Sequence, residues 1–555
     1  MKKDLPIGIS DFKEIIENQY YYIDKSLFIK EILNSGAKVI LLPRPRRFGK
    51  TLNISMLKYY FEKNDEENNL FKGLKIEKSG EQYLKHQGQY PVIFLTFKDV
   101  QDGKWQNSYN KIKRIIIEEF EKHDYLYDPN ILKESEMNFF KAVISGKAEK
   151  DVYEDSLKYL SKFLYDYHQQ KVIILIDEYD APIQSGHLNN YYNKVVSFMR
   201  GFLSGGLKDN IALKKGILTG ILRVGKESIF SGLNNLSVYT ILDTKFNKFF
   251  GLLEHEVKEF MSEYKLKDKF DEVKKWYNGY NFGGNIIYNP WSIVKYIESN
   301  GIAEPYWLNT SSNDVIKDIL KESGPGVKND LEVLIDGGSL EKKIYKHITY
   351  NEIWESRWTI FSFLLFSGYL KADDVRRDMG DIYCSLQIPN QEVKYMYKNI
   401  IQKWFNSSIA PEKLNIMLYS LTSGDIITFE EIFQEYVLRS FSYFDIGGKE
   451  PENVYHAFVL GMLVYLSSEY EIKSNRESGY GRYDVMLIPK KKEKLGLIME
   501  FKKAKKDSNM EDVARKALAQ IEEKKYQQVL IERNVENIIE IALVFAGKKV
   551  IVRKR

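Results

Sequence analysis

A short apolar run followed by a loop that ends in Gly-Lys-Thr constrains this chain more than any other feature. The run is Val39–Leu42, and the loop closes with Gly49, Lys50 and Thr51 before a helical pattern begins. A strand, such a loop and a helix together form a phosphate-binding P-loop. The N-terminus of the helix offers unpaired N–H groups and partial positive charge to a phosphate. We expect Lys50 to reach the outer phosphates of a nucleotide and the Thr51 hydroxyl to bind Mg²⁺.

One position in this loop departs from the usual signature. In the pattern G-x-x-x-x-G-K-[ST], the first glycine would stand where this chain has Arg44. Pro43 and Pro45 fix φ on either side of it and stiffen the loop. On this segment alone, a phosphate site and a chance Gly-Lys-Thr are equally supported.

A second apolar run favours the phosphate site. Val172–Ile176 is followed by Asp177 and Glu178, which predicts a buried strand with carboxylates at its C-terminal edge. In an open parallel sheet, ligands bind at that edge. Asp177 would hold Mg²⁺ through water, and Glu178 would polarise the attacking water. The simpler alternative is a buried strand and an acidic turn, since Asp180 and Pro182 come next.

Length and composition limit the classes of protein that remain. A chain of 555 residues predicts several domains, and a net charge of +5 permits contact with nucleic acid without requiring it. The single cysteine, Cys384, excludes an internal disulfide framework and any Cys-rich metal site. No apolar stretch follows Met1, and runs such as Ile360–Phe366 are too short to cross a bilayer. We therefore expect a cytoplasmic protein without membrane contact.

Three segments in and ahead of the Gly-Lys-Thr loop have a distinctive sequence, namely Ile7–Phe12, Tyr22–Ser26 and Arg44–Thr51. Together they resemble the bacterial AAA-ATPase-like family. The P-loop of that family characteristically reads Arg-Pro-Arg-Arg-Phe-Gly-Lys-Ser/Thr, so an arginine in place of the first glycine is normal within it. The resemblance implies ATP and Mg²⁺ as cofactors, and nucleotide-binding residues that include Arg46, Arg47, Phe48, Gly49, Lys50 and Thr51.

Apolar runs alternate with helical patterns across the N-terminal part of the chain. Pro91–Phe97 and Ile211–Thr219 predict further strands, and the alternation predicts a parallel sheet with right-handed crossovers, the α/β architecture of P-loop NTPases. In AAA-type ATPases the strand after the acidic one carries a polar sensor, and Thr219 is the candidate here. Arg223 is a candidate γ-phosphate contact, although an ordinary surface arginine is equally supported.

The middle of the chain changes to a helical pattern with aromatic turns. Tyr277–Phe282, Tyr288–Ser292 and Trp307 also resemble the family, and we interpret them as packed turns of a helical lid-like subdomain. Binding of a base on these aromatics is the weaker alternative. We expect domains at 1–250 (ATPase), 251–320 (lid), 321–445 (a mixed connector) and 446–555.

The last domain has the predicted order α-β-β-β-α-β, with Asp484 on one strand and Glu500-x-Lys502 on the next. This arrangement resembles the PD-(D/E)xK nuclease superfamily, which has an α/β restriction-endonuclease-like fold. Because side chains alternate along a strand, Glu500 and Lys502 should share a face while Phe501 packs on the other. Charged residues that merely end two strands are the alternative, which the element order and the ATPase resemblance disfavour.

The resemblance assigns roles to these residues. Asp484 and Glu500 would hold Mg²⁺, and Lys502 would position or deprotonate the attacking water. Glu452 is a further candidate metal contact, and Gln520 matches a position that the superfamily often carries near its site. The usual Pro before the first Asp is replaced by Tyr483. We expect flanking lysines to track phosphates, namely Lys490, Lys491, Lys492, Lys494, Lys503, Lys505 and Lys506.

Together these features predict an ATP-binding and ATP-hydrolysing protein coupled to metal-dependent cleavage of nucleic acid, with DNA as the favoured partner. A role in defence or mobile-element processing is an analogy from the architecture. The main alternative is a non-cleaving switch in which ATP governs assembly and the C-terminal domain only binds DNA. An oligomer formed through the ATPase domain is compatible with either. A protein remodeller would need an aromatic pore loop, for which the sequence offers no clear candidate.

Overall fold

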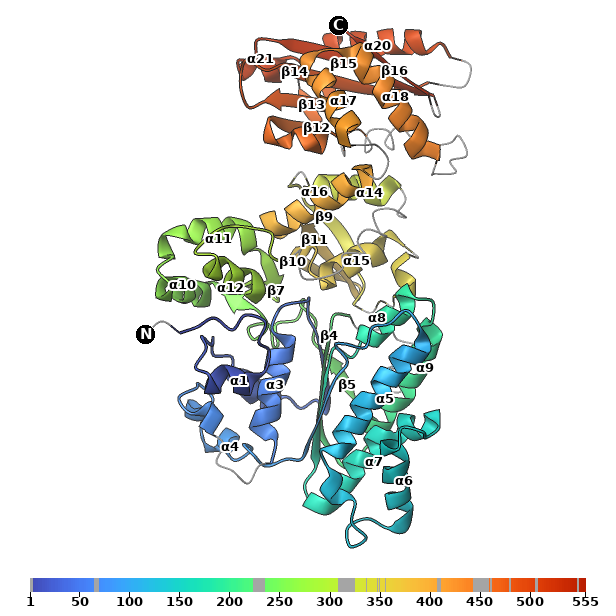
Figure 1. Cartoon of the computed structure of the whole chain (residues 1–555). Helices are drawn as coiled ribbons and strands as arrows, with labels where there is room; N and C mark the ends of the chain where they lie inside the picture. The colour runs from blue at the N-terminus through green and yellow to red at the C-terminus, as the bar shows by residue number, and fades with distance from the viewer. Residues whose placement is uncertain are drawn as a thin grey trace. The chain divides into compact units, whose positions relative to one another are not determined.

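The computed structural model comprises two compact units, Met1–Ser311 with Ser339–Val393, and Ser312–Gly338 with Lys394–Arg555 (Figure 1). The residues that it describes are 3–63, 69–222, 235–307, 325–335, 337–346, 348, 350–354, 356–406, 411–442, 459, 462–478, 481–504, 508–546 and 549–555. Each unit is built around its own five-stranded sheet.

The first unit contains a parallel sheet with the strand order β2-β3-β4-β1-β5. The strands are β1 (Val39–Pro43), β2 (Val92–Thr96), β3 (Val172–Asp177), β4 (Leu213–Gly220) and β5 (Leu236–Val238). Helix α3 (Lys50–Phe61) covers one face, and α5 (Trp105–Glu121), α7 (Lys150–His168) and α9 (Tyr192–Leu207) cover the other (Figure 1). The predicted P-loop-type α/β architecture is confirmed.

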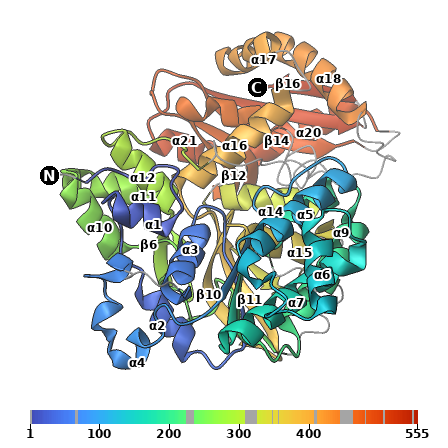
Figure 2. The same cartoon turned by 60° about the horizontal axis from the view of Figure 1, so that its bottom comes forward.

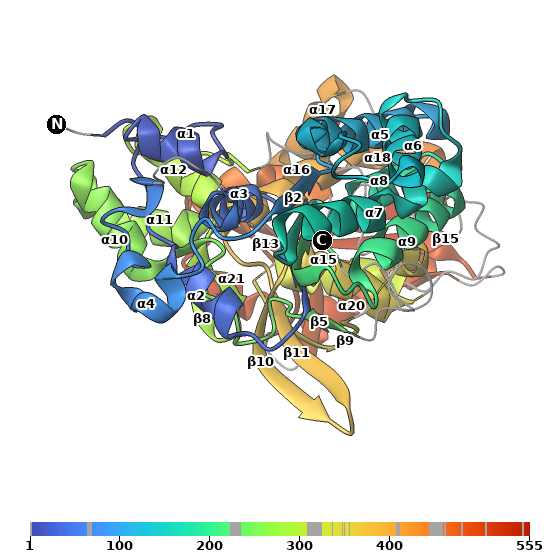
Figure 3. The same ribbon diagram turned by 90° about the horizontal axis from the view of Figure 1, so that it is seen from below.

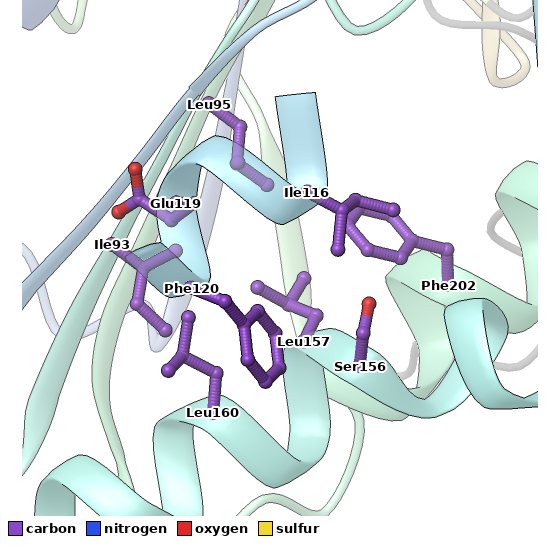
Figure 4. Close-up of a pocket in the computed structure, with 9 residues that line it drawn as sticks. All are labelled: Ile93, Leu95, Ile116, Glu119, Phe120, Ser156, Leu157, Leu160 and Phe202. Carbon is purple, nitrogen blue, oxygen red and sulfur yellow. The ribbon is translucent and has the colours of Figure 1, made fainter. Parts of the chain in front are cut away.

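An acidic side chain protects the outer edge of this sheet. Strand β2 is an edge strand, and Glu119 of α5 accepts a hydrogen bond from the Phe94 N–H (2.8 Å) and another from Lys122 Nζ (2.7 Å). Edge N–H groups left open would invite pairing with another chain. A small pocket beside Glu119 is lined mainly by apolar side chains from β2, α5, α7 and α9 (Figure 4). None of the loop residues 44–51 lines it.

The N-terminal segment is fastened to the helix that follows the P-loop. Asp11 caps α1 (Phe12–Glu17) through the Glu14 N–H, and it also accepts hydrogen bonds from Ser55 Oγ (3.1 Å) and Tyr59 Oη (3.0 Å) of α3. Helix α2 (Leu27–Asn34) follows. These contacts explain why an Asp stands ahead of the loop: its carboxylate links two helices that are about 40 residues apart in the chain.

The segment after β5 belongs to the first unit, and we call it the lid after the lid-like subdomain that the sequence predicts. It contains α10 (Glu254–Glu263), α11 (Phe270–Tyr277) and α12 (Pro290–Glu298) around an aromatic core. Part of the segment that we expected to form turns is instead strand β7 (Tyr280–Phe282), which joins β8 (Asn285–Tyr288) and β6 (Leu252–Leu253) in a three-stranded sheet. A second small sheet follows, made of β9 (Leu340–Ile344), β10 (Lys371–Asp378) and β11 (Asp381–Gln387), beside α15 (Arg357–Phe366). Figure 3 shows β10 and β11 as a long hairpin.

A buried carboxylate connects this lid to the end of the first unit. Glu392, at the start of α16 (Gln391–Asn406), has no exposed surface and accepts hydrogen bonds from Ser292 Oγ (2.8 Å) and from the Trp307 N–H (2.6 Å). Burial raises the pKa of Glu392 to about 7, although both hydrogen bonds favour the charged form.

The raised pKa predicts a pH-dependent stability. An unfolded Glu has a pKa of about 4.3, so the folded chain binds this proton more tightly than the unfolded chain does. The contribution of Glu392 to the free energy of unfolding should therefore fall as the pH rises, by about 2–3 kcal/mol between pH 5 and pH 8. Urea unfolding of wild type and Glu392→Gln at both pH values should show the drop only in wild type. An equal drop in both proteins would contradict the assignment.

The second unit contains a mixed sheet with the strand order β12-β13-β14-β15-β16. The strands are β12 (Tyr470–Ser478), β13 (Gly481–Pro489), β14 (Gly496–Lys503), β15 (Ile538–Ala546) and β16 (Lys549–Lys554), and only β14 and β15 are parallel neighbours. Helix α20 (Met510–Glu523) packs on one face, and α17 (Pro411–Ser423) and α18 (Ile426–Ser442) pack on the other (Figure 2). Two shorter elements are α14 (Pro325–Ile335) and α21 (Gln528–Glu532).

Helices α17 and α18, which we expected within a connector, share a core with this sheet. Leu414, Phe429 and Phe433 belong to the same buried cluster as Leu497 and Phe501. Side chains of α18 also satisfy the edge strand β16: Gln434 accepts from the Val550 N–H (2.7 Å) and Glu430 accepts from the Val552 N–H (3.0 Å). The boundary expected at residue 446 therefore cuts through a hydrophobic core.

This core predicts how the unit behaves when it is isolated. A fragment of residues 411–555 retains both helices and should melt cooperatively, whereas 446–555 exposes the apolar face of the sheet. Loss of several buried side chains, worth about 1.5–3 kcal/mol each, should leave the shorter fragment unfolded or molten. Thermal denaturation followed by circular dichroism compares them. Equal, cooperative melting of both fragments would contradict the shared core.

Among the described residues, none of the helices combines the length and the hydropathy that crossing a bilayer requires.

Candidate nucleotide and nuclease sites

The loop between β1 and α3 is the candidate phosphate-binding loop. Gly49 ends it in the left-handed conformation (φ 80°), which glycine adopts without steric cost. Lys50 is almost completely buried, and its Nζ donates to the carbonyl oxygens of Arg44 (3.3 Å) and Pro45 (3.1 Å). The ammonium therefore lies against the carbonyls of the loop itself, ahead of the N-terminus of α3.

At the centre of the candidate site, two hydroxyl groups donate hydrogen bonds to one carboxylate. Thr51 Oγ1 donates to Asp177 Oδ2 (2.7 Å), and Thr219 Oγ1 donates to Asp177 Oδ1 (2.6 Å). Asp177 ends β3, Thr219 lies near the end of β4, and Thr51 begins the helix after β1. The strand order places β4 between β3 and β1, so the three C-terminal ends meet. Thr51 and Thr219, which the sequence proposed separately, thus both donate hydrogen bonds to Asp177.

Acidic groups surround Lys50. Burial lowers the pKa of Lys50, and the charges of Glu178, Asp177 and Asp180 oppose that shift. Burial likewise lowers the pKa of Arg47, against the charge of Glu178. Arg47 (φ 67°) and Glu178 (φ 48°) both have left-handed backbones, which are uncommon for non-glycine residues.

The Arg44 side chain points away from the candidate phosphate site and supports the loop through contacts with the protein interior. Its Nη1 donates to the carbonyl oxygens of Pro43 (2.8 Å) and Tyr239 (2.7 Å), and its guanidinium lies 5.0 Å from the ring centroid of Phe250. The side chain is fully buried, which lowers its pKa to about 9. An arginine at this position therefore anchors the loop to the segment after β5, and a glycine there would remove the anchor.

Arg46 and Phe48, which we expect at the nucleotide, contact other side chains of the protein. Arg46 Nη2 donates to Gln184 Oε1 (2.8 Å) on α8 (Ala181–Leu188). The ring of Phe48 is buried against Tyr280 and Phe282 of the lid, with ring centroids 4.9 and 5.2 Å apart. The Phe48 ring thus packs against strand β7. Arg223 lies outside the described residues.

Asp180 is a site residue that our sequence reasoning treated only as part of a turn. Its carboxylate accepts the backbone N–H groups of Ile221 (2.8 Å) and Leu222 (2.9 Å), just beyond Thr219. Burial raises its pKa to about 6. A Cβ at Gly220 would lie 2.6 Å from Asp180 Oδ1, so only glycine fits there. The sequence signal that could have identified Asp180 is its position two residues after Glu178.

The second candidate site lies on the sheet of the second unit. Strands β13 and β14 are antiparallel with Val485 opposite Met499, which sets Asp484 beside Glu500. Asp484 Oδ2 accepts the Phe501 N–H (2.7 Å), and Glu500 is buried. Phe501 packs in the core on the opposite face. The register therefore brings the two predicted carboxylates to one face.

Lys502 and Gln520 complete this cluster. Lys502 Nζ donates to Glu500 Oε1 (2.8 Å), and Gln520 Nε2 of α20 donates to the same oxygen (2.5 Å). Gln520 also donates to Tyr526 Oη at 3.4 Å. The pKa of Tyr526 is raised, first by burial and then by the charges of Glu500 and Asp484. Tyr526 is the residue here that sequence reasoning missed, because no spacing rule links it to Glu500.

The donor set fits a hard divalent cation in part. Asp484 and Glu500 supply carboxylate oxygens, which Mg²⁺ prefers. Within the ranges that the structure describes, no group of three or more His, Cys, Asp or Glu residues is arranged to hold a metal ion. Glu452, expected as a further ligand, lies outside those ranges.

Most of the lysines expected to flank the site lie elsewhere. Lys490, Lys491, Lys492 and Lys494 occupy the turn between β13 and β14, whereas Asp484 lies near the start of β13. Lys490 lies six residues after Asp484, which corresponds to about 20 Å along an extended strand. Lys494 pairs with Glu469 (2.6 Å) and Lys490 donates to the Ser467 carbonyl (2.8 Å). These four lysines do not flank Asp484, because the strand carries them away from it, and their contact with phosphates stays a prediction. Lys503 ends β14 near the site, and Lys505 and Lys506 lie outside the described residues.

Two family models match this chain. Residues 6–230 match the family described as "Predicted AAA-ATPase", and residues 450–555 match the PD-(D/E)XK nuclease superfamily. The first match includes the P-loop and the Asp177 strand, and the second includes Asp484, Glu500 and Lys502.

A curated relative extends across much of the chain. It is described as an uncharacterized protein in the vnfD 5' region of Azotobacter chroococcum mcd 1, and it is 27% identical over 401 residues. The match covers 71% of this chain and 69% of that protein.

Proposed function

We propose that this chain, which contains an AAA-ATPase-like domain and a C-terminal PD-(D/E)xK nuclease-superfamily domain, binds and hydrolyses ATP and couples this to metal-dependent cleavage of nucleic acid, with DNA the favoured substrate. ATP binding and hydrolysis are supported by the hydrogen bonds of Thr51 and Thr219 to Asp177. Lys50, which directly precedes Thr51, is buried. The Asp484–Glu500–Lys502 group supports the nuclease part.

Each residue of the first group has a role in this proposal. Lys50 leaves the loop carbonyls for the outer phosphates, where its charge offsets theirs. Thr51 and Asp177 are the residues that would hold Mg²⁺, which neutralises charge that develops on the phosphates. Glu178 orients and polarises the attacking water. Thr219 fixes Asp177 through its hydroxyl, so that the carboxylate presents its other lone pairs toward the site.

In the second site the polar side chains prepare one face of the sheet. Asp484 and Glu500 are the residues that would hold Mg²⁺, which lowers the pKa of a bound water and stabilises charge on the phosphate. Gln520 and Lys502 orient Glu500. Lys502 also supplies a proton-transfer group or a positive charge to the attacking water.

A second candidate function has one observation in its favour. At the C-terminal site, only the carboxylates of Asp484 and Glu500 converge among the described residues. Glu500 already accepts hydrogen bonds from Lys502 and Gln520. An incomplete metal site of this kind would favour a domain that does not cut DNA, in a protein whose ATP state governs assembly.

The decisive test is to incubate the full chain with panels of DNA and RNA, with and without ATP and Mg²⁺. Mg²⁺-dependent cleavage supports the enzyme, and its sensitivity to ATP supports the coupling. Tight, salt-dependent binding without cleavage under all these conditions would support the switch instead. Absence of ATP turnover would overturn the ATPase part.

A further inference from the structure

An arginine of the P-loop lies on a tryptophan of the lid. The Arg47 guanidinium carbon is 4.7 Å from the centroid of the Trp291 ring, a cation–π distance. Trp291, at the start of α12, packs against the aromatic core of the lid, and its indole N–H donates to the Tyr306 carbonyl (3.2 Å). The ring is therefore fixed from one side, and the long arginine side chain is the partner free to turn elsewhere.

The next residue along α12 holds the start of helix α16. Ser292 Oγ donates to the buried Glu392, whose other oxygen accepts the Trp307 N–H. Two further contacts hold the residues just ahead of that helix. Asn390 Nδ2 donates to the Asn278 carbonyl (2.9 Å). The Pro389 carbonyl lies so close to Gly279 that a Cβ at Gly279 would be only 2.1 Å from its oxygen. The lid thus clamps residues 389–392.

Helix α16 continues beyond this clamp into the other unit. It spans Gln391–Asn406, whereas the first unit ends at Val393 and the second resumes at Lys394. The first turn of the helix is therefore held by the lid, and the rest of it belongs to the unit that contains Asp484 and Glu500. A change in the hydrogen bonds to Glu392 therefore acts close to one of the three points at which the chain passes from one unit to the other.

We propose that Arg47 reports the nucleotide state to α16 by leaving the Trp291 ring for the phosphates of bound ATP. The inference rests on the proposed ATP binding. Charge-assisted hydrogen bonds to phosphate are stronger than a partly exposed cation–π contact, so the two partners compete unequally for one guanidinium. A ligand shifts an equilibrium only through contacts that differ between the two states, and this exchange of partners supplies such a difference. Without nucleotide, Arg47 holds α12 against the loop; with nucleotide, α12 and the clamp on Glu392 are released from it.

Hydrogen exchange of the full chain, with and without AMP-PNP and Mg²⁺, tests this relay. In wild type, AMP-PNP should speed amide exchange in residues 290–298 and 391–397 by about 2- to 30-fold, the factor that one cation–π contact can supply. In Trp291→Leu the same amides should already exchange faster without nucleotide and should not respond to AMP-PNP. Trp291→Phe keeps a weaker aromatic face and should respond partially.

A matched control separates the contact from general loss of a tryptophan. Trp276 packs against the same lid core as Trp291, with no contact to Arg47 among those described, so Trp276→Leu should keep the full response. AMP-PNP affinity is measured for every protein in parallel. If wild type does not bind AMP-PNP, the proposed ATP function fails and the relay fails with it. If wild type binds but residues 391–397 do not respond, or respond equally in Trp291→Leu, the ATP site stands and the relay is overturned.

Discussion

Replacing Asp484 or Glu500 by alanine should eliminate Mg²⁺-dependent cleavage of nucleic acid, with losses of at least about 10³-fold. Each change removes a candidate metal ligand, and metal ions contribute several kcal/mol to transition states of this kind, where about 1.4 kcal/mol corresponds to tenfold in rate. Lys502→Ala should spare Mg²⁺ binding and slow cleavage by about 10²-fold, since general acid–base assistance is worth that much. Cleavage at saturating DNA and Mg²⁺ titration measure the two effects separately.

A carboxylate at the other end of the same hairpin provides the control. Glu493 lies in the β13–β14 turn and is exposed, so Glu493→Ala should cut as well as wild type. ATP hydrolysis should stay within about twofold in all four variants, because the two groups of residues belong to different units. If the three site variants cut as well as Glu493→Ala, the activity does not come from this cluster and the domain is a binding module.

Lys50→Ala should lower ATP affinity by about 10²-fold or more. Hydrogen bonds to charged groups contribute about 1.5–3 kcal/mol each, and Lys50 would make more than one with the phosphates. Glu178→Gln should retain ATP binding and lose about 10²- to 10³-fold in hydrolysis, because the amide no longer accepts a proton from the attacking water. Isothermal titration with ATP and a phosphate-release assay separate binding from chemistry.

The matched control for Lys50 lies on the same helix. Lys58 of α3 is partly exposed and pairs with Glu62 at 3.8 Å, so Lys58→Ala changes the charge of the helix without touching the loop. It should bind and hydrolyse ATP as wild type does. Equal turnover by wild type, Lys50→Ala and Glu178→Gln would remove the ATPase assignment, even if nucleic-acid cleavage persisted.

The sequence by itself determined those parts of the protein that local pattern controls. Apolar runs that end in polar residues identified the strands that carry Asp177 and Thr219, and Gly49 marked the loop, since strand length, alternation and backbone freedom depend on neighbouring residues. The period-two spacing of Glu500 and Lys502 predicted their shared face for the same reason.

Tertiary structure alone decided which distant residues meet. Arg44 is an anchor because Tyr239 and Phe250 lie behind the loop, and Asp180 joins the candidate nucleotide site because its side chain reaches the N–H groups after Thr219. No short pattern records such contacts, since they join segments that are 40 to 200 residues apart.

The sequence also could not show how far a strand carries its last residues from its first, or which helices share a core with a sheet. The lysines near Lys490 follow Asp484 closely in sequence, but an extended strand carries them about 20 Å from it. Helices α17 and α18 resemble a connector in isolation, and only the apolar face of the C-terminal sheet shows where they pack. Local pattern fixes what each element is; the burial of one element against another, which no single segment contains, decides where it lies and what it does.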